Sequence, residues 1–143
     1  MTIHSFEFAT PQYDESVRLR DKLLRKPLGM EFETEELAKE YQCIHLGAFD
    51  DRGKMVGCLV LEPKEEGVYK MRQVAVEEPS QGKGIGKSLV LASEVVVKSL
   101  GAKNLILHAR DTAIPFYEKL DYKKVGEEFY EVSILHIKME KRF

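Results

Sequence analysis

The segment Gln81-Gly82-Lys83-Gly84-Ile85-Gly86 constrains the fold more than any other part of this sequence. It lies between an apolar run typical of a strand, residues 68–76, and a run with apolar residues at helical spacing, residues 87–100. Glycine lets the backbone turn sharply and approach a ligand closely. The first amides of a helix have no partner inside it and lie at its positive end. The segment therefore predicts a loop that holds a phosphate or pyrophosphate, with Lys83 and Lys87 adding charge nearby.

Two common phosphate-binding motifs do not fit this spacing. A Walker A loop needs G-x-x-x-x-G-K-[ST], and Gly86-Lys87-Ser88 supplies its end, but its first glycine falls on Gln81. A dinucleotide-binding fingerprint needs G-x-G-x-x-G, and its third glycine falls on Lys87. A turn that only joins a strand to a helix is the remaining structural alternative, although alternating glycines exceed what such a turn needs.

Strands and helices are predicted along the rest of the chain. A strand, the glycine-rich loop, a helix and a further strand form a βαβ unit in the middle, which places two parallel strands side by side. The predicted strands are residues 3–9, 44–49, 55–61, 68–76, 104–109, 122–125 and 132–139, and the predicted helices are 15–25 capped by Asp14, 34–41 capped by Thr34, 87–100 and 112–120. These elements predict one α/β domain of the α+β type over residues 1–143, with a mixed, mostly antiparallel central sheet of about six to seven strands and about four flanking helices.

Composition and charge narrow the class of protein. Hydrophobic residues make up 43% and charged residues 32% of the chain, and the net charge is −2. Without a global positive charge, the chain is not expected to bind nucleic acid. No segment approaches the roughly 18 apolar residues that span a bilayer, and no signal pattern begins the chain, so a cytoplasmic protein without membrane association is expected. Cys43 and Cys58 lie in apolar runs outside any metal-ligand spacing, which predicts buried, reduced thiols and no metal.

Two motifs connect the chain with a known family. The spacing Gln81-x-x-Gly84-x-Gly86 resembles the Q/R-x-x-G-x-G/A acetyl-CoA motif of the GNAT superfamily of N-acetyltransferases. The segment Ala113 to Tyr122, AIPFYEKLDY, is similar to the A-I-x-x-Y-E-K-L-G-[FY] segment of that family. The order of elements agrees over nearly the whole chain. The resemblance implies the GNAT fold, in which the two parallel strands splay apart at one end, and acetyl-CoA as the co-substrate.

The resemblance also implies which residues bind the coenzyme. Backbone amides of the glycine-rich loop hold the pyrophosphate, and a Cβ at any of its glycines would crowd the phosphates. The preceding strand pairs with the pantetheine arm, and one of its amides polarises the thioester carbonyl. The thioester enters the gap between residues 71–76 and 104–109. The implied coenzyme-binding residues are Val74, Ala75, Val76, Gln81, Gly82, Lys83, Gly84, Ile85, Gly86, Lys87 and Phe116.

Proton transfer needs an acid and a base. Tyr117 occupies the position of the tyrosine that protonates the departing thiolate in similar proteins, and core packing against Phe116 is the structural alternative. His108 is the preferred base because it lies near the end of the strand facing the gap and imidazole accepts protons near pH 7. An ordinary structural role for His108 is the alternative. A chain of waters and the side chains of His136, Glu33 and Glu78 are the other candidates for the base.

The chain departs from the family pattern at two positions. Arg110 stands where many relatives have asparagine, and it is expected to contact coenzyme phosphates, an acidic part of the substrate or solvent. Asp121 stands where glycine is usual, and aspartate tolerates a left-handed backbone better than most residues. The turn is therefore expected to survive.

The predicted function is transfer of an acetyl group from acetyl-CoA to a primary amine of a small molecule or peptide, by direct attack in a ternary complex. A non-catalytic acyl-CoA-binding or sensing module and a nucleotide-binding protein are the alternatives. The acceptor is not specified by the sequence. The acidic run of residues 31–36 either attracts a cationic amine or serves as a solvated helix start. Homodimers are common among similar proteins, so a homodimer is a further expectation.

Overall fold

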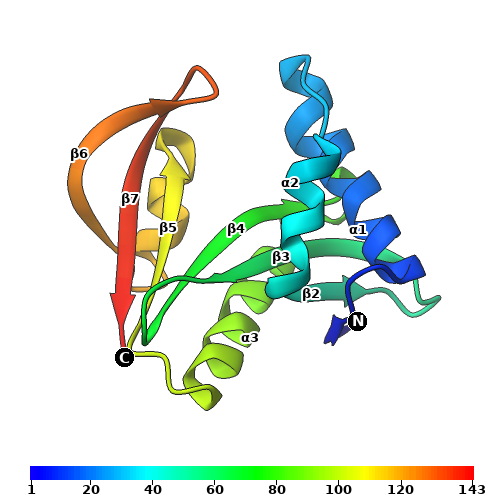
Figure 1. Cartoon of the computed structure of the whole chain (residues 1–143), viewed down its shortest axis with the longest axis horizontal. Coiled ribbons are helices and arrows are strands. Elements are labelled where there is room, and N and C mark those ends of the chain that lie inside the picture. The colour runs from blue at the N-terminus through cyan, green and yellow to red at the C-terminus, as the bar shows by residue number, and fades with distance from the viewer.

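A seven-stranded sheet in the order β1-β2-β3-β4-β5-β7-β6 runs through the protein (Figure 1). The structure is a computed structural model that describes all residues, 1–143. Only β4 and β5 pair in parallel, and all other neighbouring strands are antiparallel. The strands are β1 (Thr2–Phe6), β2 (Ile44–Phe49), β3 (Met55–Pro63), β4 (Val68–Val76), β5 (Asn104–Arg110), β6 (Lys123–Glu131) and β7 (Ile134–Arg142), and the α-helices are α1 (Pro11–Arg20), α2 (Thr34–Ala38), α3 (Ile85–Ser99) and α4 (Ile114–Glu118). The predicted fold class is confirmed.

The helices lie on both faces of the sheet (Figure 1). The main core lies between α3 and the sheet, where Leu89, Val90 and Val97 are fully buried. A smaller core joins Leu19 of α1 to the opposite face of β2 to β4. Both cysteines are free thiols, and burial raises the pKa of Cys43 to about 11 and that of Cys58 to about 12. The structure has no helix that is both long and apolar enough to cross a membrane.

Several predicted boundaries are wrong, each for a local reason. The first helix begins at Pro11 because Thr10, not Asp14, is its cap, and the Thr10 hydroxyl accepts a hydrogen bond from the Tyr13 amide at 3.3 Å. After α1 the chain continues as a π-helical turn and then a 3-10 turn, over residues 21–28. The last two strands form one longer hairpin, whose turn at Val132 and Ser133 has φ angles of 46° and 63°.

The two parallel strands separate after a short stretch of pairing. Residues Val68–Met71 of β4 pair with Asn104–Leu107 of β5, and no pairing follows (Figure 1). On its other edge β4 carries a bulge, because two residues, Gln73 and Val74, lie opposite one residue of β3. Gln73 has a φ angle of 53°, which is rare for a residue with a side chain. A bulge bends its strand and increases its twist, and here it accompanies the turn of β4 away from β5. The predicted splay of the parallel pair is therefore confirmed.

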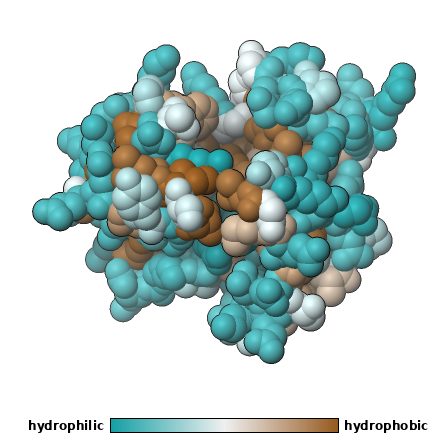
Figure 2. All heavy atoms as spheres, turned by 90° about the horizontal axis from the view of Figure 1, so that it is seen from above, coloured by the Kyte–Doolittle hydropathy of each residue, from teal (hydrophilic) through white to brown (hydrophobic).

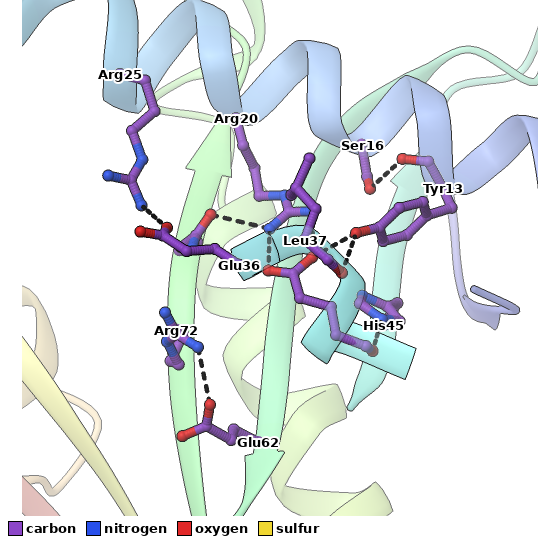
Figure 3. Close-up of polar contacts among 11 residues, drawn as sticks. Tyr13, Ser16, Arg20, Arg25, Glu36, Leu37, His45, Glu62 and Arg72 are labelled. Carbon is purple, nitrogen blue, oxygen red and sulfur yellow. Dashed lines mark hydrogen bonds and ion pairs between the residues drawn. The ribbon is translucent and has the colours of Figure 1, made fainter. Parts of the chain in front are cut away.

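A buried ion pair fixes this bulge to the helical layer. Arg20 of α1 has no exposed surface, and its Nη1 and Nη2 donate to the two carboxylate oxygens of Glu40 at 2.9 Å each (Figure 3). Nη1 also donates to the side-chain oxygen of Gln73 at 2.9 Å. The Tyr13 hydroxyl donates to Glu40 at 2.8 Å. One guanidinium thus joins α1, the turn after α2 and the strained residue of β4.

The ion pair holds Glu40 in its charged form. Burial raises the pKa of this carboxyl, but the hydrogen bonds and charge of Arg20 outweigh burial, so the pKa lies below its ordinary value. Two charges removed from water are tolerated when they are paired in good geometry, whereas one left alone is strongly destabilising. The network is therefore expected to tolerate little change in either partner.

Replacing Glu40 tests this network. Glu40→Gln leaves the Arg20 charge buried and unpaired, so we expect the free energy of unfolding to fall by about 3–5 kcal/mol. The exposed, unpaired Glu66 is the control, and Glu66→Gln should change the free energy of unfolding by no more than about 0.5 kcal/mol. Urea unfolding at pH 7 measures both variants, and equal small losses would contradict the account.

The pH dependence of the same variant supplies a second readout. Since the pKa of Glu40 is depressed in the folded protein, its stabilisation is complete above the unfolded pKa and is lost as pH falls through the folded pKa. The difference in the free energy of unfolding between wild type and Glu40→Gln should therefore become smaller below about pH 4.

Candidate functional site

A cavity of about 260 Å³, named here the gap cavity, opens where β4 and β5 separate. Residues 70–74 of β4 form one wall and residues 107–110 of β5 form the other. The rest of its lining comes from the turns after α1, from α4 and the residue before it, and from the β6–β7 hairpin: Leu24, Arg25, Leu28, Met30, Ala113, Tyr117, Glu131, Val132 and His136. Figure 2 views the molecule from above, and shows apolar side chains gathered among polar ones on this face.

The glycine-rich loop follows the C-terminal end of β4 and precedes α3. Gly82 and Gly84 both have φ angles of 79°, a left-handed backbone that favours glycine. Gly84 is the cap of α3 and offers no side-chain acceptor, so the first amides of the helix have no partner inside it. The Gln81 side chain turns back and donates to the Val76 carbonyl at 2.9 Å, which ties the loop to the strand. The loop therefore has the backbone geometry of an anion cradle.

Gly86 differs from the other two glycines of the loop. It lies in the first turn of α3, where a Cβ would lie 3.6 Å from Phe116 Cζ and 3.8 Å from Val76 Cγ2. These are ordinary contacts, so the protein itself has room for alanine at this position. The backbone requires glycine at Gly82 and Gly84 but not here.

Tyr117 lines the gap cavity from α4. Its side chain is 8% exposed and packs edge-on against Phe116, with ring centroids 5.0 Å apart. Burial alone raises the pKa of Tyr117 to about 12, so the phenol keeps its proton at neutral pH. Phe116 is exposed, and its ring contacts Tyr117 and lies beside Gly86. Tyr117 therefore packs against Phe116, as the structural alternative predicted, and also lines the gap cavity, as the acid role requires.

His108 also lines the gap cavity, from the opposite wall. Its Nδ1 is buried without a hydrogen bond and lies 3.5 Å from Oε2 of Glu131. Burial and the positive charge of Lys70 lower the pKa of His108, so the imidazole is neutral at pH 7. An imidazole in this state can accept a proton in the cavity.

Of the other candidates for the base, one lines the gap cavity and two lie outside it. His136 lines the gap cavity, but its Nδ1 lies 2.7 Å from the Ile134 carbonyl, which occupies that nitrogen as a donor. Glu33 precedes α2 and Glu78 lies in the turn after β4, and neither lines the cavity. The geometry thus brings His108 and Tyr117 together and leaves both glutamates outside.

The two departures from the family pattern are accommodated. Arg110 lines the gap cavity and forms no ion pair. Asp121 has a φ angle of 72°, and the turn around it is closed by a hydrogen bond from the Tyr122 amide to the Tyr117 carbonyl at 3.1 Å. The expected left-handed aspartate is therefore found, and Tyr117 keeps its place at the end of α4.

Sequence reasoning did not identify the basic side chains of the cavity. Arg25, Lys70 and Arg72 line it, whereas the acidic run of residues 31–36 does not. The signal was present in β4, because Lys70 and Arg72 alternate with the buried Met71 and so share the other face. No group of three or more His, Cys, Asp or Glu side chains is arranged to hold a metal ion.

Comparison with known proteins identifies the family and confirms the fold. Residues 21–143 match the family model of an acetyltransferase (GNAT) domain. The chain is 28% identical over 131 residues to the uncharacterised N-acetyltransferase YjcF of Bacillus subtilis, across 91% of this chain and 92% of that protein. Its fold is similar to that of an acyl-CoA N-acyltransferase from Pseudomonas aeruginosa, at 20% identity and a TM-score of 0.83 over 98% of both chains. A GNAT family acetyltransferase from Elizabethkingia anophelis with acetyl-CoA bound has 20% identity and a TM-score of 0.76, over 99% of this chain and 97% of that one.

Proposed function

Because the chain belongs to the GNAT acetyltransferase family, we propose that it transfers the acetyl group of acetyl-CoA to a primary amine of a small molecule or peptide. The amine attacks the thioester directly in a ternary complex, and residues 1–143 act as one domain. The observation that carries the proposal is the gap cavity, which has Tyr117 and His108 in its lining and shares β4 with the glycine-rich loop.

The coenzyme fits the unpaired backbone of the chain. The pyrophosphate binds the free amides between Gly82 and Lys87, at the positive end of α3. Past Met71 the gap edge of β4 has no strand partner, so the backbone of residues 74–76 can pair with the amides of the pantetheine arm as a further strand would. Phe116 covers the arm near Gly86. The acetyl-CoA bound in the Elizabethkingia anophelis relative supports this choice of coenzyme.

In the cavity, His108 accepts a proton and Tyr117 stabilises the leaving group. The amine nitrogen forms an amide bond with the acetyl carbonyl carbon of the thioester, and the bond from that carbon to the CoA sulfur breaks. A backbone amide of residues 74–76 stabilises the negative charge that develops on the carbonyl oxygen. The Tyr117 hydroxyl donates to the departing sulfur. Its pKa lies above the value near 8.5 of a typical thiol, so it stabilises the thiolate chiefly as a hydrogen-bond donor. His108 accepts the proton that the amine loses.

The glycines of the loop provide a test of coenzyme binding. Gly84→Ala places a side chain on a left-handed backbone, so we expect a loss of about 1–2 kcal/mol in the free energy of unfolding and weaker CoA binding. Contrary to the crowding expected at every glycine of the loop, Gly86→Ala has room for its methyl group and matches the alanine that the family motif accepts here, so it should keep both stability and CoA binding. Thermal unfolding with and without CoA, together with calorimetric titration, measures both quantities. Equal CoA affinity in the two variants would contradict the cradle.

Removal of the Tyr117 hydroxyl tests its proposed role at the leaving sulfur. We expect Tyr117→Phe to lower kcat about 10²-fold with little change in CoA affinity, because the hydroxyl acts on the sulfur only as the bond breaks. Wild-type kcat should show no loss from Tyr117 ionisation below about pH 11, since the pKa of Tyr117 is about 12. Release of free thiol from acetyl-CoA measures the rate. An unchanged kcat would exclude the role, and CoA binding without turnover of any amine would favour a non-catalytic acyl-CoA-binding module.

The base is tested through the pH profile. Because the base works only when neutral, kcat at saturating amine should fall as pH drops through the depressed pKa of His108. We expect His108→Gln to lower kcat at least about tenfold and to lack this acid limb. His4→Gln, at an exposed histidine outside the cavity, is the control and should keep the wild-type profile. If the limb persists in His108→Gln, a chain of waters replaces the proposed base.

A further inference from the structure

The side chains that line the gap cavity are unbalanced in charge. Arg25, Lys70, Arg72 and Arg110 contribute positive charges, and Glu131 is the one carboxylate among the lining residues. The protein as a whole has a net charge of −2, so the imbalance is local to the cavity. Charges in a hollow with low-dielectric walls act more strongly on a ligand than the same charges on an open surface.

Two of the four cations have a protein partner. Arg72 donates to Glu62 at 2.8 Å, and Arg25 lies 3.8 Å from Glu36 (Figure 3). Lys70 and Arg110 form no ion pair, although each is only partly exposed. Burial and the positive charge of Arg72 lower the pKa of Lys70 and outweigh the negative charges of Glu131 and Glu62, so the charged form of Lys70 is disfavoured at this position. A negative group beside Lys70 would relieve that cost.

Lys70 belongs to the β4 wall of the cavity and lies near His108 of the β5 wall. It pairs with Ile106 of β5, two residues before His108, and alternation along β5 places Ile106 and His108 on the same face. The charge of Lys70 also reaches the His108 ring, whose pKa it lowers. Lys70 is therefore near the proposed base without occupying its position.

We infer that the acceptor amine carries an anionic group, a carboxylate or a phosphate, which binds beside Lys70 while its amine faces His108. This inference rests on the proposed acetyl transfer and names the acceptor class for the same site. Arg110 adds a second unpaired cation to the cavity. Polyamines and aminoglycosides, which are multiply positive, meet repulsion from the same side chains. The acidic residues 31–36, which could attract a cation, lie outside the cavity lining.

Matched acceptors test the inference directly. The pairs are β-alanine with its amide, glycine with glycinamide, and phosphoethanolamine with ethanolamine, with spermidine as the cationic comparison. We expect at least one anionic member to exceed its neutral partner in kcat/KM by about tenfold or more, as for a hydrogen bond to a charged group. The first two pairs report a carboxylate acceptor and the third reports a phosphate acceptor.

Variants of Lys70 locate the effect. With the preferred anionic acceptor, Lys70→Met should raise KM about tenfold or more and leave kcat nearly unchanged, whereas Lys70→Arg should retain the wild-type KM. The measurement is made at pH 8, where His108 is neutral in every variant. Lys124→Met, an exposed lysine of β6 outside the cavity, is the control.

The outcomes separate the inference from the proposed function. Turnover in which neutral or cationic acceptors equal or exceed the anionic ones overturns the inference and leaves the acetyl transfer standing. So does an equal effect of Lys70→Met on anionic and neutral acceptors. No turnover with any amine, when CoA still binds, overturns both.

Discussion

The bulge at Gln73 is the constraint on which the rest of the structure depends. It accompanies the turn of β4 away from β5 after Met71, and this separation creates both the gap cavity and an unpaired strand edge. A left-handed backbone at a residue with a side chain is unfavourable by about 1–3 kcal/mol, and the gap leaves backbone groups without strand partners. The hydrogen bond from Arg20, itself forked onto Glu40, holds the strained residue in place.

The same strand contributes to each part of the candidate site. Met71 is buried in the main core and Ala75 in the smaller core on the opposite face, because the bulge interrupts the alternation of β4 between them, and Lys70 and Arg72 lie on the cavity face. Its free edge is available to the coenzyme arm, and its end leads into the glycine-rich loop. A shift of β4 by one residue would move all these groups to the other face of the sheet. The buried hydrogen bonds of Arg20 to Glu40 and Gln73 fix the position of β4 and so of the site.

The sequence predicted those features that depend on local patterns. Apolar periodicity and turn residues were sufficient for the βαβ unit, and two motifs placed the loop and Tyr117. The Arg20–Glu40–Gln73 network was missed because its members lie far apart in the chain and because buried charges leave no periodic signal. The turn at Val132 and Ser133 was missed because neither residue is a usual left-handed one. The charge of the cavity was missed because the face of β4 that opens to it depends on the splay. The roles of the loop, Tyr117 and His108 stay predictions.

A crystal structure of the protein with CoA bound tests the central claim most directly. The account predicts that the pyrophosphate contacts the amides between Gly82 and Lys87, that the pantetheine arm pairs with the free edge of β4, and that the sulfur lies in the gap cavity within hydrogen-bonding distance of the Tyr117 hydroxyl. CoA bound elsewhere would contradict it. So would a complex in which β4 pairs with β5 beyond Met71 and closes the gap.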